Sequence, residues 1–150
     1  MMKKHTRVLG VLMAGMMAVS TAAIIPVNAA DTADTGFRFQ FSRNYQYDLN
    51  GNRKKDDDTS VYVYPSYVQN GKLNIETMGR NSYGDNKWRN YTLPVNDVYL
   101  KTGTEYSIQN KINEAGCDWT QLRSAAPYGN TANGKWSPDS VGYYSAPETY

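Results

Sequence analysis

The sequence predicts an all-β protein, a small antiparallel sandwich or open barrel of about seven short strands that follows an N-terminal signal peptide. Residues 36–42 (GFRFQFS) alternate apolar and polar side chains, as a strand with one buried face does. Two β-rich runs flank Asn70-Gly71, a dipeptide typical of two-residue hairpin turns. The chain has 13 Tyr, 3 Trp and 3 Phe, and aromatic side chains pack well on a pleated sheet.

Residues 1–29 have the features of a signal peptide. Three basic residues precede a long run of apolar and small residues, which ends at Val27-Asn28-Ala29. Small residues at this point are typical of a cleavage site, so we expect cleavage after Ala29. Residues 30–150 should then form a single secreted β domain that makes no membrane contact. An uncleaved N-terminal anchor is the alternative, because the apolar run is long.

The charge of the secreted domain bears on its partners. The whole chain has 16 Lys and Arg against 14 Asp and Glu. Three of the basic residues and none of the acidic ones lie in the leader, so the remaining domain is nearly neutral. We therefore expect no nucleic-acid partner, because such binding depends on an excess of positive charge.

Catalytic side chains are scarce in the domain. The only histidine is His5, and its loss with the leader removes histidine-dependent catalysis and histidine metal sites. Cys117 is the only cysteine; we expect a buried thiol, with pairing between chains as the alternative. Two carboxylates alone are sufficient for glycoside hydrolysis, but the acidic residues lie mostly in turn-like segments. We therefore predict that the protein is not an enzyme.

The remaining strands follow from local pattern. Strands are expected at residues 36–42, in a hairpin over 59–79, and at 88–93, 98–101, 106–112 and 117–125. In the hairpin, Val68 should pair with Leu73. Pro65 lacks a backbone donor and indicates an edge or a bulge. Residues 44–58 should be a polar connection, and residues 127–150 a loop-rich C-terminal segment anchored by Trp136.

The polar connection contains a weak calcium pattern. Asp48, Asn50, Asn52 and Asp56 carry oxygen-bearing side chains at alternate positions, as in loops that wrap a calcium ion. Arg53, however, stands where an EF-hand loop needs glycine. We therefore expect a solvated connection and no cofactor, with calcium as the alternative.

Tyrosines are the candidate ligand-binding residues. Six of them fall in segments read as loops, and several of the six are expected at the surface: Tyr45, Tyr47, Tyr83, Tyr128, Tyr143 and Tyr144. Tyrosine offers a flat apolar face and a hydroxyl at low entropic cost, so sugar rings and proteins bind to it readily. We assign Tyr128, Tyr143 and Tyr144, together with Trp136, to a ligand-binding face. The alternative is that these rings only cover loops.

Four segments carry a resemblance to a known group: GFRFQFS, RKKDDDTSVYVYP, LRSAA and GKWSPDSVG. Together they span residues 36–142, with residues 136–140 (WSPDS) the most specific. The chain resembles small secreted proteins of unknown function from Gram-positive bacteria, which are more distantly similar to lactococcin-type bacteriocins. The resemblance implies a secreted β-rich fold and carries over no catalytic residue.

Two functions follow from these observations. The first is a secreted or cell-surface interaction domain that binds a glycan, such as a cell-wall glycan, or a surface protein. The second, implied by the resemblance, is a bacteriocin-like secreted factor that acts on the envelopes of neighbouring bacteria.

Overall fold

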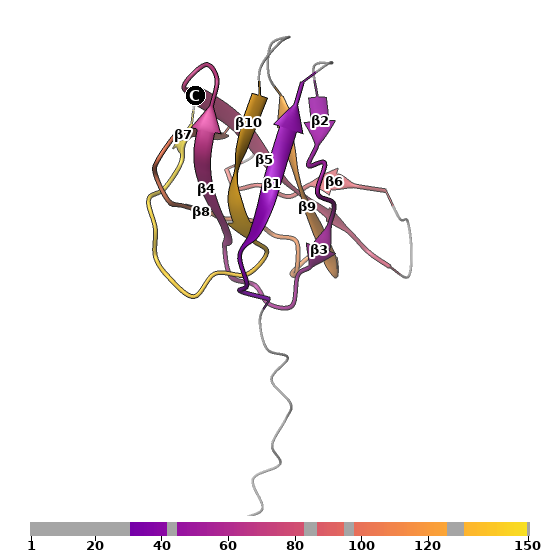
Figure 1. The fold of residues 1–150 in the computed structure, drawn as a ribbon. Helices are drawn as coiled ribbons and strands as arrows, with labels where there is room; N and C mark the ends of the chain where they lie inside the picture. Colours follow the sequence, from indigo (N-terminus) through magenta and orange to yellow (C-terminus); the bar gives the residue numbers. More distant parts are fainter. Residues whose placement is uncertain (1–30, 42–44, 83–86, 95–97, 126–130, 150) are drawn as a thin grey trace, which may run out of the picture.

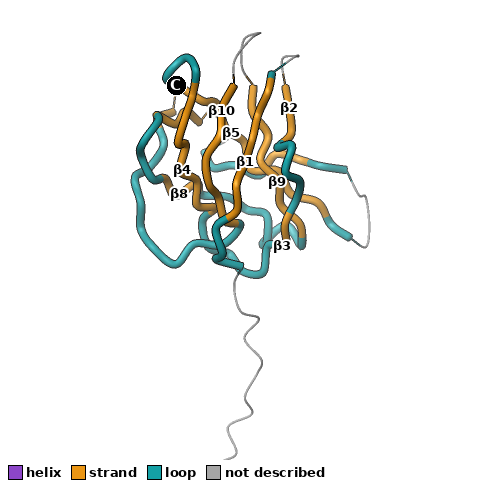
Figure 2. Tube along the Cα trace, in the orientation of Figure 1, coloured by secondary structure: helices purple, strands orange, loops and turns teal. Residues whose placement is uncertain are grey.

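The computed structural model describes residues 31–41, 45–82, 87–94, 98–125 and 131–149. These residues form eleven β-strands and no helix (Figure 2), so the all-β prediction is confirmed. None of them belongs to a helix long and apolar enough to span a membrane. The predicted signal peptide, its cleavage site at Ala29 and the candidate residue Tyr128 lie outside the described residues.

The strands are arranged in two sheets, which identifies a sandwich rather than an open barrel (Figure 1). The first sheet has four strands, all antiparallel to their neighbours. In spatial order they are β1 (Thr35–Gln40), β10 (Thr131–Ser137), β4 (Val61–Val68) and β8 (Tyr106–Ile108).

The second sheet has seven strands. Five follow one another in the order β11 (Glu148–Thr149), β7 (Val98–Lys101), β5 (Lys72–Arg80), β9 (Trp119–Ala125) and β2 (Tyr45–Tyr47). In addition, β3 (Arg53–Lys54) pairs with β9, and β6 (Arg89–Asn90) pairs with β5. The expected polar connection at residues 44–58 therefore contains two short strands.

The core lies between the two sheets. Phe37, Phe39 and Phe41 project into it from one side of β1 and its end, as their alternation predicts. Leu73 and Ile75 of β5 enter the same core from the other sheet. Because each sheet has one apolar face, stacking the two faces removes both from water and holds the sandwich together.

The predicted hairpin between β4 and β5 is wrong, although both strands and the turn between them exist. Gly71 has a φ of 76° and its N–H donates to Val68 O over 3.1 Å. The two strands then separate: β4 pairs with β10 and β8, whereas β5 pairs with β7, β9 and β6. Val68 and Leu73 are both buried but belong to opposite sheets. The turn therefore leads from one sheet to the other. Stacking the two sheets buries the apolar faces of both strands, whereas pairing the two strands in a single hairpin does not.

A bulge lies at Pro65, as the missing donor predicts. In the pairing of β4 with β10, Tyr67 opposes Asn133 while Pro65 opposes Gly134, so Ser66 has no partner in the ladder. The chains approach closely here. A Cβ atom at Gly134 would lie 2.1 Å from Tyr64 O, so only glycine fits this position.

The expected loop-rich segment at residues 127–150 is partly wrong. Thr131–Ser137 forms β10, an inner strand with β1 on one side and β4 on the other. Asn133 and Gly134 are poor strand formers, so this strand was not predicted from local propensity. Hydrogen bonds to two neighbouring strands and the burial of Ala132 and Trp136 outweigh that propensity. Among the described residues of this segment, those outside the strands are residues 138–147, before β11.

Candidate ligand-binding groove

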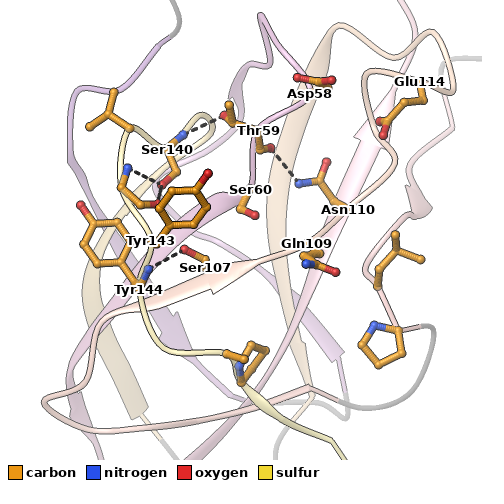
Figure 3. A pocket seen from close by; sticks show the side chains of 16 residues that line it. Asp58, Thr59, Ser60, Ser107, Gln109, Asn110, Glu114, Ser140, Tyr143 and Tyr144 are labelled. Carbon is orange, nitrogen blue, oxygen red and sulfur yellow. Dashed lines mark hydrogen bonds between the residues drawn. The ribbon is translucent and has the colours of Figure 1, made fainter.

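A groove of about 810 Å³ opens where the C-terminal loop passes the edge strand β8 (Figure 3). Its lining comes from four stretches of chain, at residues 58–60, 93–94, 107–114 and 140–147. We call it the tyrosine groove, because Tyr143 and Tyr144 form one of its sides. These stretches are distant in sequence, so the groove exists only in the folded domain.

Backbone hydrogen bonds hold the C-terminal loop against β8. Ser145 N–H donates to Glu105 O, and Ser107 N–H donates to Ser145 O, each over 3.1 Å. Tyr144 N–H donates to Ser107 Oγ, also over 3.1 Å. This side of the groove is therefore a fixed extension of the sheet edge.

The two tyrosines of the groove differ in their contacts. Tyr143 is fully exposed to solvent. Tyr144 is half-buried and packs against Tyr62, with the ring centroids 4.8 Å apart and the planes tilted by 52°. Tyr62 in turn donates its hydroxyl hydrogen to Glu105 Oε1 over 3.0 Å. One anchored ring thus stands beside one exposed ring, and the predicted exposure of Tyr143 is confirmed.

The rest of the groove is lined largely by hydroxyl and amide groups. Asn110 is buried at its base and donates through Nδ2 to Thr59 O over 3.3 Å. Within the described part of the chain, the side chains of Ser60 and Gln109 make no hydrogen bond. Figure 3 shows Gln109 and Asn110 across the groove from the tyrosines. A ligand can therefore meet an aromatic face on one side and hydrogen-bonding groups on the other.

A buried ion pair supports the groove from behind. Lys55 Nζ donates to Asp139 Oδ1 over 2.5 Å and to Thr59 O over 2.7 Å. Both charged side chains are completely buried. Asp139 Oδ2 also accepts hydrogen bonds from the backbone N–H groups of Asp31 and Asp56. The pair fixes Thr59, whose Oγ1 accepts a hydrogen bond from Ser140 N–H over 2.9 Å.

The carboxylates of this network have shifted pKa values. Burial raises the pKa of Asp139, and the hydrogen bond from Lys55 and its charge oppose that shift. Burial also acts to raise the pKa of Asp57, but hydrogen bonds from the side chain and backbone of Thr59 outweigh it and lower the pKa. The buried charge of Asp139 is tolerated because both of its carboxylate oxygens accept hydrogen bonds.

Two segments of the resemblance meet in this network. Lys55 belongs to RKKDDDTSVYVYP, and Asp139 belongs to WSPDS. The first Ser of WSPDS, Ser137, donates its hydroxyl hydrogen to Asp139 O over 2.8 Å. Both segments therefore serve the architecture of the fold.

Trp136 does not belong to the ligand-binding face. Its side chain is 0% exposed and lies in the core between the sheets. The guanidinium of Arg53 lies 5.8 Å from its ring centroid. Trp136 anchors the C-terminal segment, as predicted. Its predicted place on the ligand-binding face was wrong, because a buried ring cannot contact a ligand.

The calcium candidates have structural partners. Asp48 Oδ1 accepts hydrogen bonds from the N–H groups of Arg38 and Asn50 over 2.9 and 3.0 Å. Burial raises the pKa of Asp48, and the hydrogen bonds from these two N–H groups oppose the shift. Asn50 donates through Nδ2 to Gly36 O over 2.7 Å.

The other two calcium candidates add no further ligands around Asp48. Asn52 is exposed, and Asp56 lies beyond β3, where its N–H donates to Asp139. Among the described residues, no three or more His, Cys, Asp or Glu side chains are grouped as a metal site would require. The residues of this loop shape a turn next to β1.

Tyr45 and Tyr47 lie on the other sheet, away from the groove stretches. Both are exposed on β2, which confirms their predicted surface position. Tyr45 packs under the guanidinium of Arg123 at 5.1 Å, and the Tyr47 ring centroid lies 6.4 Å from that of Trp88. Tyr83 lies outside the described residues.

The groove residues other than the tyrosines were not predicted from the sequence. Asp58 was assigned to a polar connection, and Gln109 and Asn110 to a strand. Thr59 and Asn110, which are hydrogen-bonded in the groove, are 51 residues apart in the chain. No local pattern signals such a contact.

Comparison with known proteins identifies the family of the chain. A family model described as a protein of unknown function, DUF2712, matches residues 25–140. The match includes both partners of the Lys55–Asp139 ion pair and ends before Tyr143 and Tyr144. No curated protein and no solved structure is detectably similar to the chain. Since the match extends over most of the sequence, the chain belongs to the DUF2712 family of proteins of unknown function.

Proposed function

We propose that this protein is a secreted or cell-surface domain without enzymatic activity that binds a glycan in the tyrosine groove. The observation that carries the proposal is the fully exposed ring of Tyr143 beside the anchored ring of Tyr144. A flat aromatic face binds the apolar face of a sugar ring, and a pre-positioned ring loses little conformational entropy on binding.

The composition of the groove favours a glycan over a protein partner. Opposite the rings, Ser60 and Gln109 present polar groups that make no hydrogen bond with the described residues. Such groups match the hydroxyls of a sugar, whereas the centre of a protein interface is generally more apolar.

The export part of the proposal rests on residues 1–29 and on the resemblance to secreted proteins of Gram-positive bacteria. A basic start, a long apolar run and a small-residue cleavage site are the features of an exported protein. The proposed ligand is accordingly a glycan of the bacterial cell wall.

The test measures depletion of the mature protein, residues 30–150, from solution by purified Gram-positive cell walls. We expect wild-type protein to pellet with the walls and a Tyr143→Ser/Tyr144→Ser variant to remain in solution. Tyr67→Ser is the matched control, because Tyr67 is an exposed tyrosine of β4 that does not line the groove. Each variant is first checked for an unchanged circular dichroism spectrum.

Three results would contradict parts of the proposal. If no wall preparation depletes the protein from solution, the proposed binding of a cell-wall glycan is refuted. Depletion that disappears when the walls are treated with protease would identify a surface protein as the partner. Release of soluble reducing sugar would show an enzyme, in which case Asp58 and Glu114 of the groove are the first carboxylates to replace.

The alternative function is a bacteriocin-like factor, which the resemblance to lactococcin-type bacteriocins supports. It predicts that purified mature protein stops the growth of related bacteria. Growth inhibition by wild-type and by the double tyrosine variant alike would favour this alternative over groove binding.

A further inference from the structure

We infer that the ligand of the tyrosine groove carries positive charge, in the form of an amino-sugar polymer whose nitrogens are not acetylated. This inference rests on the proposed function and specifies its substrate class. The shape and aromatic rim of the groove provide the site, and its charges select among the glycans that fit.

The charged side chains of the groove all have the same sign. Among the described residues that line it, Asp58 and Glu114 are the ionisable carboxylates, and none is lysine or arginine. Both carboxylates are exposed, and neither makes an ion pair or hydrogen bond with another described residue. Their charge is therefore available to a ligand, unlike that of Asp139, which Lys55 neutralises.

A second hollow of about 130 Å³ extends the acidic surface past Tyr144. Tyr144 lines both cavities, and Asp34 and Glu105 line the second. The negative charges of Glu105 and Asp34 also act on the pKa of the neighbouring Tyr62. Burial raises the pKa of Tyr62, and a hydrogen bond to Glu105 and the charges of Glu105 and Asp34 raise it further. Tyr144, which packs on Tyr62, therefore stands between two acidic regions.

These charges discriminate between three kinds of glycan. A polyanionic glycan is repelled by the carboxylates, and a neutral glycan gains only stacking and hydrogen bonds. A sugar ring that carries an ammonium group gains attraction to the carboxylates of Asp58 and Glu114. N-acetylation removes the charge without changing the ring, so it isolates this contribution.

The experiment titrates mature protein with a glucosamine hexamer and with the fully N-acetylated hexamer, using isothermal titration calorimetry at low and high salt. We expect the glucosamine hexamer to bind about fivefold more tightly at low salt, as for one well-placed exposed ion pair. High salt should remove that advantage because exposed charges are screened.

Variants assign the effect to residues. Asp58→Asn/Glu114→Gln should abolish the preference for the glucosamine hexamer over the acetylated hexamer. Asp118→Asn removes one carboxylate outside the groove and should leave the preference intact. Tyr143→Ser should weaken binding of both hexamers.

The other possible outcomes would each refute a different part of the inference or of the proposed function. Equal binding of the two hexamers, both sensitive to Tyr143→Ser, would refute the charged ligand and leave glycan binding in place. If the Asp58→Asn/Glu114→Gln variant still prefers the glucosamine hexamer, the preference does not come from the carboxylates of the groove. Binding of oligolysine as tight as that of the glucosamine hexamer would replace the amino sugar with a cationic peptide. If neither hexamer nor any wall glycan binds, the proposed function itself fails.

Discussion

Lys55 Nζ lies 2.5 Å from Asp139 Oδ1, and neither side chain is exposed to solvent. The two residues are 84 positions apart in the chain. Lys55 follows β3 of the seven-stranded sheet, and Asp139 follows β10 of the four-stranded sheet. The pair therefore ties the two sheets together at one end, next to the loop that carries the tyrosines of the groove.

Replacing Lys55 by Met should lower the free energy of unfolding by about 3–5 kcal/mol, because the carboxylate of Asp139 is left buried without its cation. Urea denaturation of the mature protein measures this loss. Lys54→Met is the matched control, since Lys54 is exposed on the neighbouring position of β3; its effect should stay within about 0.5 kcal/mol. Equal effects of the two substitutions would show that the ion pair does not stabilise the fold.

Gly134→Ala should prevent folding or lower the melting temperature severely. The added Cβ would lie 2.1 Å from Tyr64 O, a backbone atom, and 2.6 Å from Cε1 of Phe37. Gly36→Ala is the control, because its Cβ would lie 3.6 Å from Asn50 Nδ2, an ordinary contact distance. That variant should change stability by no more than about 1 kcal/mol. Thermal melts that coincide for the two variants would rule out the close approach at the bulge.

The hydrogen bonds of Asp118 predict a dependence of stability on pH. Burial acts to raise the pKa of Asp118, but hydrogen bonds from the side chain and backbone of Ser82 outweigh it, so the pKa is lowered. A carboxyl group with a lowered pKa in the folded state stabilises the protein above its unfolded pKa of about 3.9, and this contribution is lost as pH falls through the folded pKa.

We therefore expect Asp118→Asn to be less stable than wild type at neutral pH, with the difference shrinking as the pH falls below about 4. Chemical denaturation at a series of pH values measures the difference. A difference that stays constant down to pH 2, or grows as the pH falls, would contradict the assignment.

Calcium should leave the melting temperature of the mature protein unchanged. Asp48 and Asn50 use their side chains for hydrogen bonds to the backbone of the fold, at Arg38 and Gly36 among other groups. A ligand that binds the folded state raises the melting temperature by mass action. Differential scanning calorimetry with excess calcium or with chelator tests this. A rise with calcium that disappears in Asn52→Ala, whose side chain is exposed, would restore the calcium loop.

Secondary structure was predictable where a short stretch carries its own pattern. The alternation at residues 36–42 predicts the strand and its buried phenylalanines, and Asn70-Gly71 predicts the turn after β4. Pro65 predicts the bulge, since its missing N–H acts locally. The exposure of Tyr143 was predictable because it follows a run of loop-forming residues.

Pairing between strands and the composition of the groove were not predictable in this way. The turn at Asn70-Gly71 is compatible with a hairpin and with a corner between sheets, and only the positions of β10, β8, β7 and β9 decide between them. β10 itself was missed because its stability comes from its two neighbours, which local propensity does not describe.

The sequence by itself determined the class of this protein: an all-β chain, rich in tyrosine. Its local patterns act over a few residues and need no partner. The tertiary structure alone decided what surrounds Tyr143 and Tyr144. Asp58, Gln109 and Glu114 join the tyrosines in one groove because a C-terminal loop crosses the edge of β8. Contacts between segments so distant in the chain form only when the two sheets stack, since stacking buries the apolar faces that hold the segments together.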